Sequence, residues 1–201
     1  MLAPRRLFDV GIPAVEMDTR AVMLVEGTSD RIALETLAGR RGSDLAAEGI
    51  SIVVMGGAQS VGRFLNRYGP MGLDLRLAGL LDAGEERELV RGLELTGLGS
   101  RHTRADMEAL GFYVCDADLE DELIRALGAA SVEEVVDAQG DLRSFRTLQK
   151  QAAWQGRPRE EQLRRFMGSG GRRKLRYARL LLDALDLTRV PWPLDGVLAQ
   201  V

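Results

Sequence analysis

Acidic residues follow three of the apolar, strand-like runs in this sequence. Glu26 comes directly after "AVMLV" and is followed four residues later by Asp30. Asp82 ends a second run, and a third leads into "DADLE", which contains Asp118 and Glu120. Parallel strands would bring these acids to one edge of a sheet, where carboxylates repel one another unless a cation neutralises them. The alternative is three independent surface turns.

The composition restricts which metal such an edge could hold. The chain has one cysteine, Cys115, and one histidine, His102, which excludes an internal disulfide and disfavours zinc or iron sites built on these residues. Oxygen ligands favour Mg²⁺, Mn²⁺ or Ca²⁺ instead. Two such ions could serve phosphodiester chemistry, one generating a nucleophile and the other stabilising the leaving group.

The overall charge and hydropathy bound the class of protein. A net charge of −3 argues against a broadly basic coat, although one local basic patch could still bind nucleic acid. No apolar run reaches membrane-spanning length, and the N-terminus lacks the apolar core of a signal peptide. We expect a cytoplasmic protein that does not contact a membrane.

Strand-like and helix-like segments alternate in the first part of the chain and predict an α/β fold. The expected strands are 21–25, 49–57, 75–84 and 111–120, and the expected helices are 30–38, 59–68 and 85–98. This rhythm favours a mostly parallel sheet with helices on both faces. We expect an N-terminal segment (1–20), an α/β core (20–120) and a helical extension (121–201) packed on the core as one domain.

Two motifs in order resemble a known family. "LVEGTSD", followed by "AGLLDAGEE", is similar to the TOPRIM domain, the acidic catalytic fold of topoisomerases, primases and some nucleases. Together with "DLEDELIRAL" and "RRKLRYARLL", the likeness is closest to the TOPRIM half of the OLD-family (overcoming lysogenization defect) nucleases. It covers about residues 20–185 and implies a TOPRIM, Rossmann-like sheet.

The resemblance implies a role for each matching residue. Glu26 and Asp30 would be acidic site residues, with Glu26 the better candidate for direct metal contact. Asp82 would be a metal ligand as the leading acid of an Asp-x-Asp pair, and Glu120 would complete a second metal position. Lys174 would steady the scissile phosphate.

The sequence departs from the family pattern at the second acid of the Asp-x-Asp pair, where it has Gly84. Glu85 or Glu86 could reach the metal instead, and Asp118, spaced Asp-x-Asp with Asp116, could compensate if the strand continues that far. If none does, the second metal is weakly held.

Lys174 is also notable within this sequence, because Lys150 and Lys174 are the only lysines among 27 basic residues. The preceding "GSGGRR" is flexible and cationic, so Arg172, Arg173 and Lys174 are candidate phosphate contacts. A solvated helix start is the alternative.

These observations predict a Mg²⁺- or Mn²⁺-dependent endonuclease acting on DNA rather than RNA. One alternative is a catalytically weak or inactive TOPRIM module that binds nucleic acid or serves a separate ATPase. The other is a TOPRIM nucleotidyl transferase or RNA-processing enzyme. Nothing in these 201 residues can serve as an ATPase, so we expect the protein either to act alone or to take an ATPase from another chain.

Overall fold

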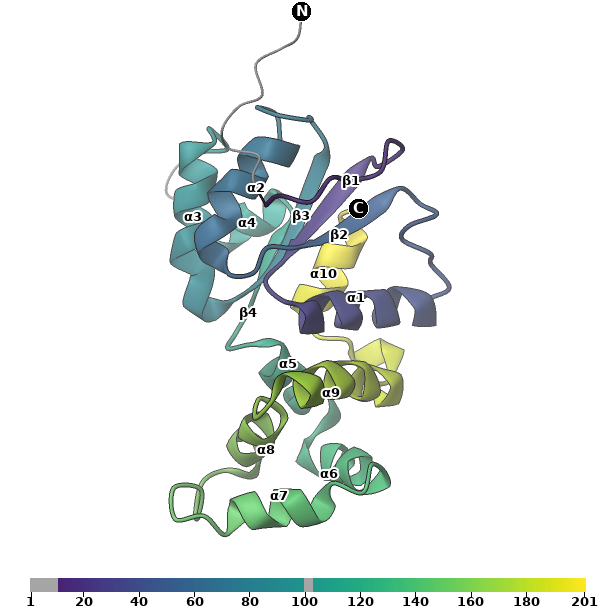
Figure 1. Cartoon of the computed structure of the whole chain (residues 1–201), viewed down its shortest axis with the longest axis vertical. Coiled ribbons are helices and arrows are strands. Elements are labelled where there is room, and N and C mark those ends of the chain that lie inside the picture. The colour runs from purple at the N-terminus through teal and green to yellow at the C-terminus, as the bar shows by residue number, and fades with distance from the viewer. Residues whose placement is uncertain (1–10, 100–102) are drawn as a thin grey trace, which may run out of the picture.

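The computed structural model describes residues 11–99 and 103–201, so His102 and residues 1–10 lie outside the described residues. Its centre is a four-stranded sheet of order β2-β1-β3-β4 (Figure 1). All neighbouring strands are parallel, as expected. The strands are β1 (Ala21–Val25), β2 (Ile50–Val54), β3 (Arg76–Asp82) and β4 (Phe112–Cys115).

Helices cover both faces of the sheet because β1 is apolar on both. Met23 and Val25 pack toward α1 (Thr28–Arg40), whereas Val22 and Leu24 belong to a second core on the opposite face. The helices that complete this second core are α2 (Val61–Tyr68), α3 (Glu86–Leu95) and α4 (Arg104–Ala109). The predicted layering is therefore confirmed (Figure 1).

Five further helices form an extension beyond the carboxyl ends of the strands, and a last helix returns to the sheet (Figure 1). The extension contains α5 (Leu119–Leu127), α6 (Ala129–Ala138), α7 (Leu142–Gln149), α8 (Arg159–Met167) and α9 (Gly171–Ala184), and the last helix is α10 (Trp192–Ala199). The extension shares the core on the α1 face of the sheet. Within the described ranges, no helix is long and apolar enough to cross a membrane.

Two contacts fix this extension to the sheet. Helix α9 lies along α1, and Arg40 of α1 donates a hydrogen bond to the carbonyl of Leu185 (2.6 Å), just after α9. Helix α10 returns to pack against β4, with Gly196 directly against the ring of Tyr113. The last helix of the sequence therefore belongs to the α/β core in space.

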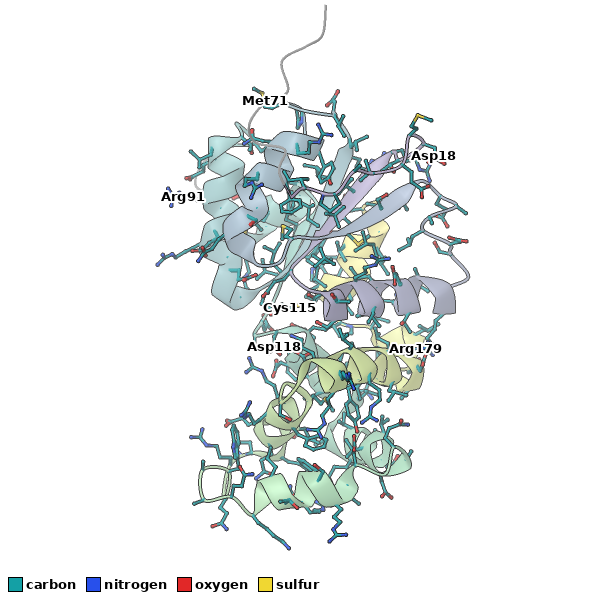
Figure 2. All side chains as sticks on the ribbon, in the orientation of Figure 1. Asp18, Met71, Arg91, Cys115, Asp118 and Arg179 are labelled. Carbon is teal, nitrogen blue, oxygen red and sulfur yellow. The ribbon has the colours of Figure 1, made fainter. Side chains whose placement is uncertain are left out.

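The expected strand over 111–120 is too long. β4 ends at Cys115, and Asp118 begins α5 as its N-cap, with its Oδ1 accepting a hydrogen bond from the Asp121 amide (2.9 Å). Asp116 and Asp118 therefore do not alternate along a strand. Figure 2 shows Asp118 beside Cys115, at the junction of sheet and helical extension.

Candidate metal centre

The turn after β1 supplies the first two acids of the site. Glu26 follows the last residue of β1 and is partly exposed. Asp30, in the first turn of α1, is only 7% exposed, and its Oδ2 accepts a hydrogen bond from the Gly27 amide (2.8 Å). Burial raises the pKa of Asp30, and the charge of Glu26 adds to this, whereas the Gly27 amide and Lys174 oppose it. Asp30 therefore both caps the helix and adds to the acid edge.

Asp82 lies at the carboxyl end of β3, opposite Cys115 of β4. Burial, followed by the charges of Asp30, Glu26 and Asp118, raises the pKa of Asp82 to about 8. The charges that act on Asp82 thus come from the turn after β1, from the start of α1 and from the N-cap of α5. The fold thus brings together acids that lie far apart in the sequence.

Glu120 and Lys174 meet at the same edge from two helices of the extension. Glu120, in the first turn of α5, is 6% exposed, and its Oε2 lies 3.3 Å from Nζ of Lys174. Its Oε1 is buried and, among the residues described, has no hydrogen-bond partner. Burial raises the pKa of Glu120, although Lys174 opposes this.

Lys174 is half-buried in the first turn of α9 and faces several carboxylates at once. Burial alone would lower its pKa, but the charges of Glu120, Asp30 and Asp82 outweigh burial and raise it. The ammonium group is therefore held in its charged form beside the acids.

Other predicted site residues contact groups outside the candidate ligand set. Asp118 caps α5 and also accepts a hydrogen bond from Nε of Arg164 (2.7 Å). Glu86 pairs with Arg104 at 3.1 Å, and Glu85 is half-buried at the end of a short 3-10 helix (Ala83–Glu85). Asp118 and Glu86 therefore form ion pairs with arginines.

The two arginines before Lys174 differ from each other. Arg172 is exposed, whereas Arg173 stacks over the ring of Phe166 (4.2 Å) and donates a hydrogen bond to Oγ of Ser169 (2.6 Å). Arg173 is therefore held in a defined position next to Lys174.

Arg164 of α8 is a site-supporting residue that the sequence analysis missed. Through Asp118 it links α8 to the helix that carries Glu120. No local motif marks Arg164, because its partner lies 46 positions away in the sequence. Only the tertiary structure identifies it.

The donor set fits a hard divalent cation, although the side chains do not form a finished metal cage. In the part of the chain that the structure describes, no group of three or more His, Cys, Asp or Glu residues is arranged to hold a metal ion. However, among the described residues the Oε1 of Glu120 is unpaired, burial and then neighbouring acids raise the pKa of Asp82, and Glu26, Asp82 and Glu120 all offer oxygen ligands.

The site therefore consists of acids at the carboxyl ends of parallel strands and a lysine that pairs with one of them. Residues 19–82 match the family model "Overcoming lysogenization defect protein-like, TOPRIM domain". Over these residues the chain is similar to an OLD-like TOPRIM domain, a class of domain that generally binds divalent metals. Glu120 and Lys174 lie beyond the matched residues.

Solved structures extend the likeness over most of the chain. The C-terminal region of the Xanthomonas campestris pv. campestris OLD protein is 25% identical, with a TM-score of 0.71 over 91% of this chain and 92% of that one. The C-terminal region of the Burkholderia pseudomallei OLD protein is 21% identical, with a TM-score of 0.65 over 90% and 96%. No curated protein matches the chain. The resemblance inferred from the sequence is confirmed.

Proposed function

We propose that this protein is a divalent-metal-dependent nuclease that hydrolyses DNA phosphodiester bonds. The observation that carries the proposal is the position of Lys174. Its ammonium group projects from the helical extension to Glu120 and interacts with Asp30 and Asp82. A cation among acids is suited to hold a phosphate that approaches the same edge.

The residues divide into metal ligands and a phosphate contact. Glu26, Asp82 and Glu120 would hold Mg²⁺ or Mn²⁺, and Asp30 would add negative charge behind them. A bound divalent ion would supply an activated water and neutralise charge on the departing oxygen. Lys174 would orient the scissile phosphate, and Arg172 and Arg173 would contact the neighbouring backbone.

Plasmid cleavage tests the proposal. Supercoiled plasmid is incubated in Mg²⁺, Mn²⁺, Ca²⁺ or EDTA with wild type or with one of three variants: Glu26→Ala, Asp82→Ala or Lys174→Gln. We expect nicking or linearisation by wild type in Mg²⁺ or Mn²⁺ and a loss of about 100-fold or more in each variant. The matched control is Glu35→Ala, which removes an exposed acid of α1 that pairs with Arg31. Full activity of both Glu26→Ala and Asp82→Ala would refute the proposal.

A second candidate is a TOPRIM module that binds nucleic acid without cleaving it, alone or with a separate ATPase subunit. The specific observations in its favour are Gly84 in place of the second acid and the lack of a finished ligand cluster in the described residues. It predicts metal-dependent DNA binding, measured by fluorescence anisotropy, without turnover even in Mn²⁺. A TOPRIM nucleotidyl transferase or RNA-processing enzyme would instead turn over nucleotide or RNA substrates in the same ions.

A further inference from the structure

The positive charge of this chain is concentrated in one segment. Residues 142–179 contain 12 of the 27 Lys and Arg residues but only 2 of the 30 Asp and Glu residues. This segment, which we call the basic segment, therefore carries ten net positive charges, and the remainder of the chain carries thirteen net negative charges. It comprises α7, α8 and the first part of α9.

Several cations of the basic segment have no acidic partner. Most of its arginines form ion pairs with acids, as Arg146 does with Glu133 and Arg176 with Asp141. Among the described residues, five cations of the basic segment form no ion pair: Arg143, Lys150, Arg165, Arg172 and Arg173. Arg173 is half-buried and the other four are exposed. Unpaired cations on three successive helices give this part of the chain a positive charge that attracts a polyanion.

The α8 and α9 part of the basic segment adjoins the candidate metal centre, and α7 lies farther from the sheet (Figure 1). Arg164 of α8 pairs with Asp118, next to Glu120, and its neighbour Arg165 is exposed. The acid edge by itself would repel the phosphates of a nucleic acid. A polyanion that reaches Lys174 would therefore need attraction from cations outside the acid edge, such as the exposed ones of the basic segment.

The aromatic residues of the basic segment indicate which nucleic acid fits. Its rings offer no platform for unpaired bases, since three are fully buried and Trp154 is half-buried beneath Arg157. The buried rings are Phe145, Phe166 and Tyr177. Single-strand binding uses exposed rings for stacking, whereas duplex binding relies on contacts to backbone phosphates.

We propose that the basic segment is a docking surface for the phosphate backbone of double-stranded DNA, which it grips without reading base sequence and presents to the acid edge. The inference adds Arg143, Lys150 and Arg165 to the phosphate contacts already proposed at the two arginines before Lys174. The inference specifies the substrate of the function proposed above, on which it rests, but its test measures binding rather than cleavage.

The test compares two triple variants with the same loss of charge. Arg143→Gln, Lys150→Gln and Arg165→Gln together remove the new contacts. The control combines Arg20→Gln, Arg76→Gln and Arg91→Gln, three exposed arginines of the α/β core. Arg20 directly precedes β1 and Arg76 is the first residue of β3, so both lie at the amino ends of the strands, and Arg91 lies on α3 (Figure 2).

Binding to a labelled duplex and to its single strand is measured by fluorescence anisotropy in EDTA at several salt concentrations. We expect wild type to bind the duplex more tightly than the single strand. The α7–α8 triple variant should bind about tenfold or more weakly at about 100 mM salt, with the slope of log K against log salt reduced by about 0.9 per contact. The control triple should stay within about twofold of wild type. Unchanged melting temperatures would show that both variants are folded.

Two outcomes overturn the inference: the α7–α8 triple binds like the control, or wild type prefers the single strand. Neither depends on catalysis. If duplex binding is lost in the triple variant while wild type cleaves nothing, the surface stands and the nuclease proposal fails. If wild type cleaves plasmid while the triple variant binds normally, the nuclease proposal stands and the surface fails.

Discussion

Asp82 lies half-buried among other carboxylates, and its protonation links the site to stability. Burial and the neighbouring acids raise the pKa of Asp82 from its ordinary value of 3.8 to about 8. The folded state therefore keeps this proton to higher pH than the unfolded chain does. Without metal, the free energy of unfolding should fall as pH rises from about 4 to about 8.

Asp82→Asn tests this directly. Asparagine has nearly the same shape but cannot ionise, so in EDTA the variant should be more stable than wild type near neutral pH and less dependent on pH. Urea denaturation of both proteins between about pH 5 and about pH 9 measures the difference in their free energies of unfolding. Parallel pH profiles for the two proteins would show that Asp82 is not the titrating group.

Gly84 gives a gain-of-function prediction at the same strand end. It is exposed, its backbone lies outside the left-handed region, and an added Cβ would meet no atom within 4 Å. Gly84→Asp should therefore fold normally and supply the second acid of the Asp-x-Asp pair. We expect Mn²⁺ affinity to rise by about tenfold, measured by isothermal titration calorimetry. Gly39→Asp controls for added charge, because Gly39 is exposed near the end of α1 and an added Cβ there also meets no atom within 4 Å. Equal affinities in the two variants would contradict the prediction.

At the scale of elements, Asp118 combines two roles that substitutions can separate. It caps α5 through the Asp121 amide and pairs with Arg164 of α8. Asp118→Ala should lower the free energy of unfolding by about 1 kcal/mol, because the cap is lost. Asp118→Asn keeps a capping oxygen and should lose much less. Urea denaturation that gave equal losses for both variants would assign the effect to the ion pair instead.

The docking of α10 on the sheet depends on a close contact. A Cβ added at Gly196 would lie 2.1 Å from the ring of Tyr113. Gly196→Ala should therefore lower the free energy of unfolding by about 1–3 kcal/mol through overpacking. Gly39→Ala in α1 is the matched control: an added Cβ there meets nothing within 4 Å, and the change should stabilise by about 0.5–1 kcal/mol. Equal melting temperatures for the two variants would contradict this packing.

At the scale of the whole molecule, the charge distribution separates an acid edge from a basic extension. Ions that bind the folded acid edge should stabilise the entire protein. We expect Mn²⁺ to raise the melting temperature saturably, by an amount equivalent to about 2.7 kcal/mol at a concentration about 100 times the Kd. Asp82→Ala should lose this shift and Glu35→Ala should keep it. An equal shift from NaCl at matched ionic strength would show nonspecific screening instead.

The sequence by itself determined the α/β class, the strands and the positions of Glu26 and Asp82 at strand ends. Runs of apolar residues that end in glycine and acid are local patterns, and local patterns determine where strands begin and end. The same locality explains the error at β4. From the sequence, the strand was expected to continue through the acids after Cys115. In the structure, the capping hydrogen bond of Asp118 begins a helix there instead.

The tertiary structure decided which side chains meet. The pairing of Glu120 with Lys174, the link from Arg164 to Asp118 and the return of α10 to the sheet each join residues that are distant in sequence. Such contacts depend on how buried faces pack against one another, which no local pattern encodes. Burial and proximity, rather than residue type, also raise the pKa of Asp82, because the free energy of a charge depends on the groups that surround it in space.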